Sequence, residues 1–354
     1  MIVGVDETPK QEILDPGGAA PDAQVNCKHR SRVYRNGVLV ASDLSLAEVA
    51  AHRADPDTVI WVDLLAPTPA DLVALAPLVG GEVELHPLAL ENAASGSQRP
   101  RLVRYRDHSL LHARAIRVDP GTGALGSTRV AAFILAEALI TIRSDDGFVL
   151  DPLLDAWDDI GELSAHGIGF LVHGLLDQLV DGYFEALDDA DERIQALEDE
   201  LLEGAGPVRA IQLQSFSLRK DVVAMSRVVL PMNEALSALL RPGVHSTSAE
   251  IVPYYQDVYD HALRATERID GLRDTIESIL ATSLAMQGNS LNEIMKKLTA
   301  WAAIIAIPTG VTGYFGQNIP FPGYSEPLGF WLSAVLLVGL ASGLWVSFRR
   351  RGWL

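Results

Sequence analysis

Uncharged, mostly apolar residues at the C-terminal end of the chain form two long runs, residues 298–315 and 328–348. Each run is about as long as a helix that crosses the hydrocarbon core of a bilayer. We therefore predict two transmembrane helices, with residues 316–327 as the loop that joins them. A buried core helix is the alternative for either run, but Trp331 and Trp345 near the ends of the second run favour a membrane span.

Basic residues flank the two runs on one side only. Lys296 and Lys297 precede the first run, three arginines at 349–351 follow the second, and the loop contains no lysine or arginine. Basic residues are enriched on the cytoplasmic side of membrane proteins. The sequence therefore predicts a multi-pass protein of the cell membrane (inner or plasma membrane), with a basic tail at 349–354 and both termini in the cytoplasm.

Upstream of the first run, apolar residues recur every three or four positions, which is typical of helices buried on one side. Gly204 and Pro207 interrupt this pattern, so residues 151–249 are predicted to form acidic antiparallel helices. The spacing resumes near Ile251, and no proline occurs between Pro253 and Pro308. We therefore predict a cytoplasmic stalk helix at 250–297 that continues into the first span at 298–315.

Residues 30–150 combine strand and helix signals and are predicted to form an N-terminal cytoplasmic α/β domain. Asn36 and Gly37 between apolar runs predict a hairpin with a type I′ turn. Thr68 before Pro69 predicts the start of a helix. The predicted strands cover residues 59–64, 108–118 and 130–142. Together with the spans, this makes the fold class an α+β membrane protein.

Composition narrows the choice of partners. Asp and Glu number 46 against 28 Lys and Arg, for a formal net charge of -18. This balance argues against a nucleic-acid partner and favours cations. Cys27 is the single cysteine, which excludes an intramolecular disulfide and a multi-cysteine metal site. Residues 1–29 lack the apolar core of a secretory signal and are predicted to be a mobile leader.

Three smaller features have two readings each. The acidic residues between positions 177 and 203 form either a solvated helix face or a surface that concentrates cations. His108 and His112 would share one face of a strand. We interpret them as ordinary histidines of that strand and not as ligands of a zinc site. Asp257 and His261, one helical turn apart, fit an ion pair or a shared metal. The sequence contains no enzyme motif, so we expect neither an enzyme nor a bound cofactor other than a transported or regulatory cation.

Two helices cannot enclose an aqueous path, so transport by such a chain would need several subunits. The first span carries small and hydroxyl-bearing residues, including Thr309 and Gly313, which suit the lining of a pore but would equally suit helix packing. Gly316, Gln317 and Asn318 follow it directly. Neutral oxygens at this position can hydrogen-bond a hydrated magnesium ion without stripping its water.

These C-terminal segments, Asn292-Glu293-Ile294-Met295-Lys296-Lys297-Leu298-Thr299 and Tyr314-Phe315-Gly316-Gln317-Asn318, resemble the CorA-type divalent cation transporters, a superfamily that includes the ZntB zinc transporters. The basic tail, Asp257-Val258-Tyr259-Asp260-His261 and His86-Pro87-Leu88-Ala89-Leu90-Glu91-Asn92 also resemble family segments. The resemblance implies a funnel-shaped homopentamer in the lipid bilayer. It also implies a set of pore-lining positions: Asn292, Met295, Leu298, Thr299, Thr309 and Gly313, with Gly316, Gln317 and Asn318 as the selectivity motif at the pore mouth.

The sequence departs from the family pattern at two positions. Gln317 stands where the usual Gly-Met-Asn signature has methionine. At the regulatory metal site, Asp257 matches the stalk acid, but its acidic partner from a neighbouring subunit is replaced by Asn92, next to Glu91. The two departures concern the identity of the ion and closure by internal magnesium.

Three functions therefore follow as hypotheses. The first is a homopentameric divalent cation channel for magnesium, with cobalt and nickel as further ions. The second is a ZntB-like zinc transporter, which the proton gradient would drive. The third is a membrane-tethered scaffold or sensor that conducts nothing, and it leaves the polar first span unexplained.

Overall fold

The computed structural model describes residues 25–55, 57–75, 85–94, 99–159, 166–204, 206–241, 249–317, 320, 323–324 and 326–354. Most of the predicted leader, residues 1–24, lies outside this range. The chain divides into two compact units, Met1–Glu192 with Lys220–Leu272, and Arg193–Arg219 with Arg273–Leu354. This division passes through three long helices.

The first unit contains a seven-stranded sheet with the order β2-β1-β3-β7-β6-β5-β4. Its strands are β1 (Lys28–Arg35), β2 (Val38–Ser42), β3 (Thr58–Leu65), β4 (Arg101–Arg104), β5 (Ser109–Val118), β6 (Leu125–Ile134) and β7 (Ala138–Arg143). Strands β3 and β7 are parallel, and all other neighbours are antiparallel. The predicted hairpin between β1 and β2 is confirmed, because Asn36 and Gly37 have the positive φ angles, 49° and 76°, of a type I′ turn.

The predicted strand at 130–142 was wrong in extent, because the structure divides it into β6 and β7. A tight turn joins them, and the backbone N–H of Leu135 donates to the carbonyl of Ala138 at 2.9 Å. The turn holds Ala136 and Glu137, without the glycine, asparagine or proline that usually marks a turn. Strand β4 was not predicted at all, since it has four residues with arginine at both ends.

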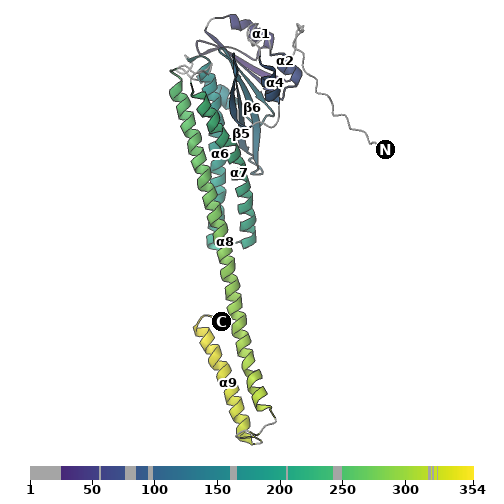
Figure 1. Ribbon diagram of the computed structural model, residues 1–354, viewed down its shortest axis with the longest axis vertical. Helices are drawn as coiled ribbons and strands as arrows, with labels where there is room; N and C mark the ends of the chain where they lie inside the picture. Colours follow the sequence, from purple (N-terminus) through teal and green to yellow (C-terminus); the bar gives the residue numbers. More distant parts are fainter. Residues whose placement is uncertain are drawn as a thin grey trace, which may run out of the picture. The chain divides into compact units, whose positions relative to one another are not determined.

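Helices cover both faces of the sheet (Figure 1). On one face lie α1 (Leu46–Ala51), α2 (Pro69–Val73) and α4 (Pro87–Ala94), which share a core with Ile60, Phe133 and Ile140. On the other face lie α5 (Asp151–Asp159) and α6 (Ile168–Glu203). There Trp61 meets Trp157 edge to face with ring centroids 5.2 Å apart, and Tyr34 meets Phe170 in the same way at 5.5 Å.

The N-terminus of α2 confirms the predicted helix start. Thr68 accepts a hydrogen bond from the backbone N–H of Asp71, and the Asp71 carboxylate accepts one from the backbone N–H of Thr68. This reciprocal capping box satisfies two N–H groups that the first helical turn would otherwise leave unpaired. Pro69 occupies the first helical turn, where its missing N–H costs nothing. A short 3-10 helix (His52–Ala54) follows α1.

The long helices agree with the predicted break and the predicted continuity. Helix α6 ends at Glu203, and α7 (Val208–Leu239) begins after the Gly204–Pro207 segment. Helix α8 (Val252–Phe315) runs for 64 residues without interruption through Pro308. Helix α9 (Pro327–Arg350) begins one residue before the predicted second span.

Buried positions on α8 alternate at spacings of four and three. Up to Ser283 they are Tyr255, Val258, Ala262, Ala265, Ile269, Leu272, Ile276, Ile279 and Ser283, and Ile251, directly before the helix, continues the spacing. A strict 3.5-residue repeat is the pattern of a coiled-coil seam. In the first unit the Tyr255 hydroxyl on this seam donates to the carbonyl of Gly169 on α6 at 3.1 Å, and the Asn233 amide on α7 donates to the Thr266 hydroxyl at 2.7 Å. The seam therefore packs α8 against the helices of its own chain.

A charged pair lies inside the core between β3 and β7. The guanidinium of Arg143 donates to both carboxylate oxygens of Asp63, from Nε at 3.2 and 3.0 Å and from Nη2 at 2.8 Å. The Thr141 hydroxyl donates to the same carboxylate at 2.7 Å, and Nη1 of Arg143 donates to the carbonyl of Phe148 at 2.9 Å. The side chain of Asp63 is 1% exposed, so this pair is held almost without water.

Removal of one partner would leave an uncompensated charge in the core. We predict that Asp63→Ala lowers the free energy of unfolding by about 3–5 kcal/mol, measured by thermal or urea unfolding of the full chain in detergent. Asp188→Ala is the control, because its pair with Arg268 is at the surface with 60% of the Asp188 side chain exposed, and its loss should cost about 0–1 kcal/mol. Equal losses in the two variants would contradict the argument.

Candidate functional site

Most of the large apolar side chains in the second half of α8 are exposed, unlike those of the buried seam in its first half. After Ser283 most of the large apolar residues are exposed, for example Leu284 (61%), Leu291 (59%), Met295 (58%) and Leu298 (62%), whereas Ala300 is buried. Helix α9 also has exposed apolar residues, for example Leu328, which is 68% exposed, and Val335, which is 66% exposed. So much exposed apolar surface needs a cover of lipid or of other protein chains.

Among the described residues, three helices are long and apolar enough to cross a membrane: α7, α8 and α9. For α8 and α9 only 6% of the apolar window is buried in the protein, whereas for α7 the fraction is 44%. Helix α7 was not predicted as a candidate span. Its apolar stripe packs within its own chain, since residues 220–239 belong to the same unit as the sheet.

The predicted pore positions all lie on α8 and all are exposed. They are Asn292, Met295, Leu298, Thr299, Thr309 and Gly313. Apart from Leu298 they fall on one stripe with spacings of three and four that also includes positions 302 and 306. At 100° per residue, Asn292 lies about 180° around the helix from Ser283, the last residue of the seam. The stripe therefore points away from the side of α8 that its own chain covers.

Threonine hydroxyls on this part of α8 donate hydrogen bonds to backbone carbonyls of the same helix. Thr309 donates to the carbonyl of Ile305 at 3.3 Å, and Thr312 donates to the carbonyl of Pro308 at 2.7 Å. Pro308 itself has no N–H, so the helix lacks one of its regular backbone hydrogen bonds at this turn. Each hydroxyl oxygen keeps lone pairs that can accept a hydrogen bond from water or from the water shell of an ion.

The predicted selectivity motif begins where α8 ends. The Gly316 N–H donates to the carbonyl of Thr312 at 2.8 Å, and a Cβ on Gly316 would lie only 2.8 Å from that same oxygen. This close approach requires glycine at position 316. Gly316 and Gln317 are exposed. Asn318, the third residue of the motif, lies outside the described residues.

The three residues predicted for a regulatory metal site do not meet within one chain. Asp257 is on α8, 66% exposed, with a carboxylate oxygen 4.0 Å from Nε2 of His261. Glu91 and Asn92 are on α4, on the opposite face of the sheet from α6, against which α8 packs. No group of three or more His, Cys, Asp or Glu able to hold a metal was found among the described residues. The two elements therefore do not bring these residues together within one chain.

Sequence reasoning missed a histidine beside Asp257. Burial of His173 on α6 lowers its pKa, while the negative charges of Asp177 and Asp257 act in the opposite direction. The pKa of Asp181 is raised, first by burial and then by the charge of Asp177. The spacing of His173 and Asp177, one helical turn, was the available signal. Acidic groups from α6 and α8 thus gather along one side of this unit.

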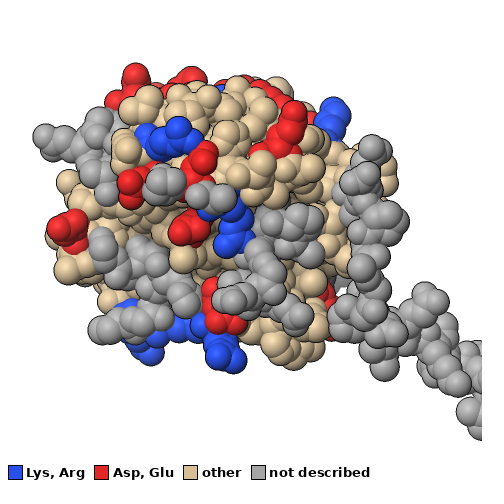
Figure 2. Space-filling view, turned by 90° about the horizontal axis from the view of Figure 1, so that it is seen from above, with Lys and Arg blue, Asp and Glu red and all other residues tan. Residues whose placement is uncertain are grey.

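Both charge signs are present on the face drawn in Figure 2. Lys and Arg residues are interspersed with Asp and Glu, and the described residues form no continuous basic surface in that view. A nucleic-acid footprint would require such a surface. Charge on this face therefore gives no support to a nucleic-acid partner.

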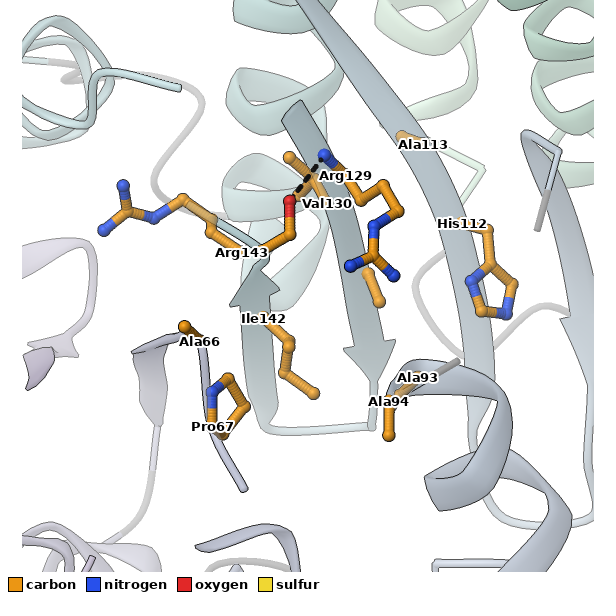
Figure 3. A pocket seen from close by; sticks show the side chains of 12 residues that line it. Ala66, Pro67, Ala93, Ala94, His112, Ala113, Arg129, Val130, Ile142 and Arg143 are labelled. Atoms are coloured by element: carbon orange, nitrogen blue, oxygen red, sulfur yellow. Dashed lines mark hydrogen bonds between the residues drawn. The ribbon is translucent and has the colours of Figure 1, made fainter. Parts of the chain in front are cut away.

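A cavity of about 220 Å³ lies at the carboxyl ends of the parallel strands β3 and β7, next to the end of α4. Arg129 of β6 and His112 of β5 are among its lining residues, and the Arg143 side chain extends away from both (Figure 3). His112 is 5% exposed. Burial and, to a smaller extent, the charge of Arg101 lower its pKa to about 4, so the imidazole is neutral. His108 is also buried and stacks on Tyr105 with centroids 4.7 Å apart.

The sequence model of the family described as "CorA-like Mg2+ transporter protein" matches residues 56–350. The cobalt/magnesium transport protein CorA of Thermotoga maritima is 27% identical over 85% of this chain and 85% of its own length. A zinc transport protein, ZntB of Pectobacterium carotovorum, is 28% identical over 83% of this chain and 88% of its own length. The solved structure of the CorA magnesium transporter from Methanocaldococcus jannaschii has the same fold, with a TM-score of 0.73, 24% identity, and coverage of 92% of this chain and 98% of that one.

The neutral state of His112 makes the fold sensitive to acid. Below pH 6.5 the unfolded chain binds a proton at this imidazole, while the folded chain binds it only near pH 4. This contribution to stability is complete above pH 6.5 and is lost as the pH falls, by about 3 kcal/mol at pH 4. We predict that His112→Gln reduces the difference in unfolding free energy between pH 7 and pH 4. Identical pH profiles for parent and variant would contradict the assignment.

Proposed function

The chain belongs to the CorA-like Mg2+ transporter family, and from this premise we propose that it carries divalent cations across the cell membrane, with magnesium as the main cargo. The observation that carries the proposal is the exposed stripe on α8. It joins Asn292, Thr299 and Thr309 on the side of the helix that the chain itself leaves uncovered. Polar and small side chains there are costly against lipid but favourable around water and a hydrated ion.

In a homopentamer, neighbouring subunits would enclose the exposed stripe of α8. Five copies of α8 with their stripes turned inward would enclose a polar path, and α9 would face the lipid. Met295 and Leu298 would form an apolar constriction at the basic end of the first span, and Gln317 and Asn318 would stand at the far end. We assign only α8 and α9 to the membrane, because nearly half of the apolar window of α7 is already buried in its own chain.

The arrangement of the second unit supports cytoplasmic placement of both basic ends. Lys297 of α8 and Arg349 of α9 line the same groove, so the start of the first span and the end of the second lie together. Basic residues on one side of a two-helix hairpin favour retention of that side in the cytoplasm. The loop at 316–327, which has no lysine or arginine, would then face the outside.

Zinc is the second candidate cargo, since a protein named for zinc transport is as similar to this chain as one named for cobalt and magnesium. The purified chain should be reconstituted in liposomes that contain a magnesium dye or a zinc dye, with and without a pH gradient. We expect magnesium influx without a pH gradient. Zinc influx that depends on the gradient would favour the second candidate, and no influx of either ion would leave a non-conducting scaffold.

At the proposed pore mouth, Asn318 should matter more than Gln317. The Asn318 amide oxygen can accept a hydrogen bond from the water shell of the ion, and we predict that Asn318→Ala abolishes selective magnesium influx in the liposome assay. Gln317→Met, which restores the common family signature, is the matched control and should conduct. Normal selective influx through Asn318→Ala would rule out this role.

Regulation should depend on Asp257 and position 92 of a neighbouring subunit. Acidic groups held close across subunit interfaces repel by roughly 1–4 kcal/mol per close pair, and a divalent cation between them would relieve that repulsion. Asn92 removes one charge per interface, so closure should need more internal magnesium. We predict that Asn92→Asp increases the protection of the full-length protein from protease by magnesium, and that Asp257→Ala removes the protection seen in the parent.

Asp260→Ala is the control for this experiment, since it removes an acid three positions from Asp257 that hydrogen-bonds to Gln256 instead. If the parent and Asp257→Ala respond to magnesium identically, Asp257 is not a sensor. It would then be a partner of His261 in the helix, as the distance of 4.0 Å between them allows.

A further inference from the structure

A groove of about 390 Å³ lies between the basic ends of α8 and α9. Its lining residues are Lys297, Trp301, Trp345, Arg349 and Leu354. Each helix contributes one basic residue and one tryptophan four positions apart, hence one turn along the helix. The basic residue stands just outside the apolar run in both cases, and the tryptophan stands inside it.

The aromatic rings of the groove are partly exposed, and one of them contacts a basic side chain. The Arg349 guanidinium carbon lies over the Trp345 ring, 5.1 Å from its centroid, which is a cation–π contact. Trp301 remains 52% exposed and Trp345 39% exposed. Tryptophan prefers the headgroup level of a bilayer, because its ring is apolar and its N–H can donate a hydrogen bond.

The end of α9 is folded so that the tail closes one side of the groove. The Trp353 N–H donates to the carbonyl of Phe348 at 2.9 Å, the Gly352 N–H donates to the carbonyl of Arg349 at 3.2 Å, and Gly352 has a φ of 67°. This is the Schellman motif of a helix C-terminus. The rings of Trp353 and Phe348 stack at 5.4 Å and 9°, which is the apolar contact that accompanies the motif. The motif places Leu354 in the wall of the groove.

We propose that this groove binds the phosphate headgroup of an anionic phospholipid in the leaflet at the basic ends of α8 and α9. Lys297 and Arg349 would contact the phosphate, and Trp301 and Trp345 would contact the glycerol and the upper part of the acyl chains. The groove presents two cationic side chains and no carboxylate side chain. Basic pockets between membrane helices at this depth are suited to anionic headgroups. The proposal concerns anchoring in the bilayer and stands independently of which ion is transported.

The charge of the groove differs from that of the chain as a whole, which is -18. An anionic membrane surface repels a body with this net charge, so attraction to anionic lipid must come from a local cluster of basic side chains. Lys297 and Arg349 form such a cluster, with Lys296 and Arg350 as neighbours that do not line the groove. These neighbours provide a control with the same change in charge.

The test uses the full chain in detergent, incubated with phosphatidylglycerol or phosphatidylcholine, and counts the lipids retained by native mass spectrometry. The parent should retain phosphatidylglycerol in preference to phosphatidylcholine. The pair Lys297→Gln and Arg349→Gln should weaken that binding by about tenfold or more. The matched pair Lys296→Gln and Arg350→Gln should retain it, and Arg349→Lys should also retain it, because the charge stays in the groove.

Several results would overturn the proposal. Equal loss in the two double variants would mean that lipid responds to surface charge and not to this groove. A changed oligomeric mass with unchanged lipid binding would assign the groove to a neighbouring subunit. No preference for phosphatidylglycerol in the parent would exclude an anionic headgroup. If the groove variant does not fold by circular dichroism, Trp345→Leu gives the same test, with weaker retention expected and unchanged retention contradicting the site.

Discussion

A helix that leaves a folded domain and enters a bilayer packs against protein at one end and against lipid at the other. On α8 this change occurs at Ser283, where the heptad seam that packs against the chain's own helices ends and large exposed apolar residues begin. The backbone hydrogen bonds continue through the change, because the helix is uninterrupted over 64 residues. Lipid or other protein chains must cover the remaining exposed apolar surface, and the proposals of two membrane spans, of an oligomer and of a polar path along α8 all depend on this.

The sheet separates the polar residues that were predicted to form a regulatory metal site. Asp257 and the α4 residues Glu91 and Asn92 lie on elements that pack against opposite faces of the sheet, so they do not meet within one chain. The buried pair of Asp63 and Arg143 ties the two parallel strands of the sheet together through a bidentate contact.

Features governed by short stretches of sequence could be predicted from the chain. The Asn36-Gly37 turn, the Thr68 cap, the break at Gly204 and the continuity of α8 each depend on local backbone preferences or on a repeated spacing. Features governed by distant contacts could not. The turn at Ala136 and Glu137 has no turn residue and is held by strand pairing, and α7 is apolar enough for a membrane yet half-buried against its own chain. The pore stripe was predicted as a set of positions, but only the structure gives its direction opposite the seam, and Asn318 remains a prediction from the sequence.

The fixed angle between seam and stripe restricts how the length of α8 can vary. Deletion of one residue between Ser283 and Asn292 would rotate everything beyond it by about 100° relative to the seam. The residues of the stripe would then turn toward α9 or toward lipid, although every side chain was kept. A change of a whole heptad costs only about 20° of rotation. Insertions and deletions tolerated in this helix should therefore come in sevens, and two such chains of unequal stalk length can still present the same face to their neighbours.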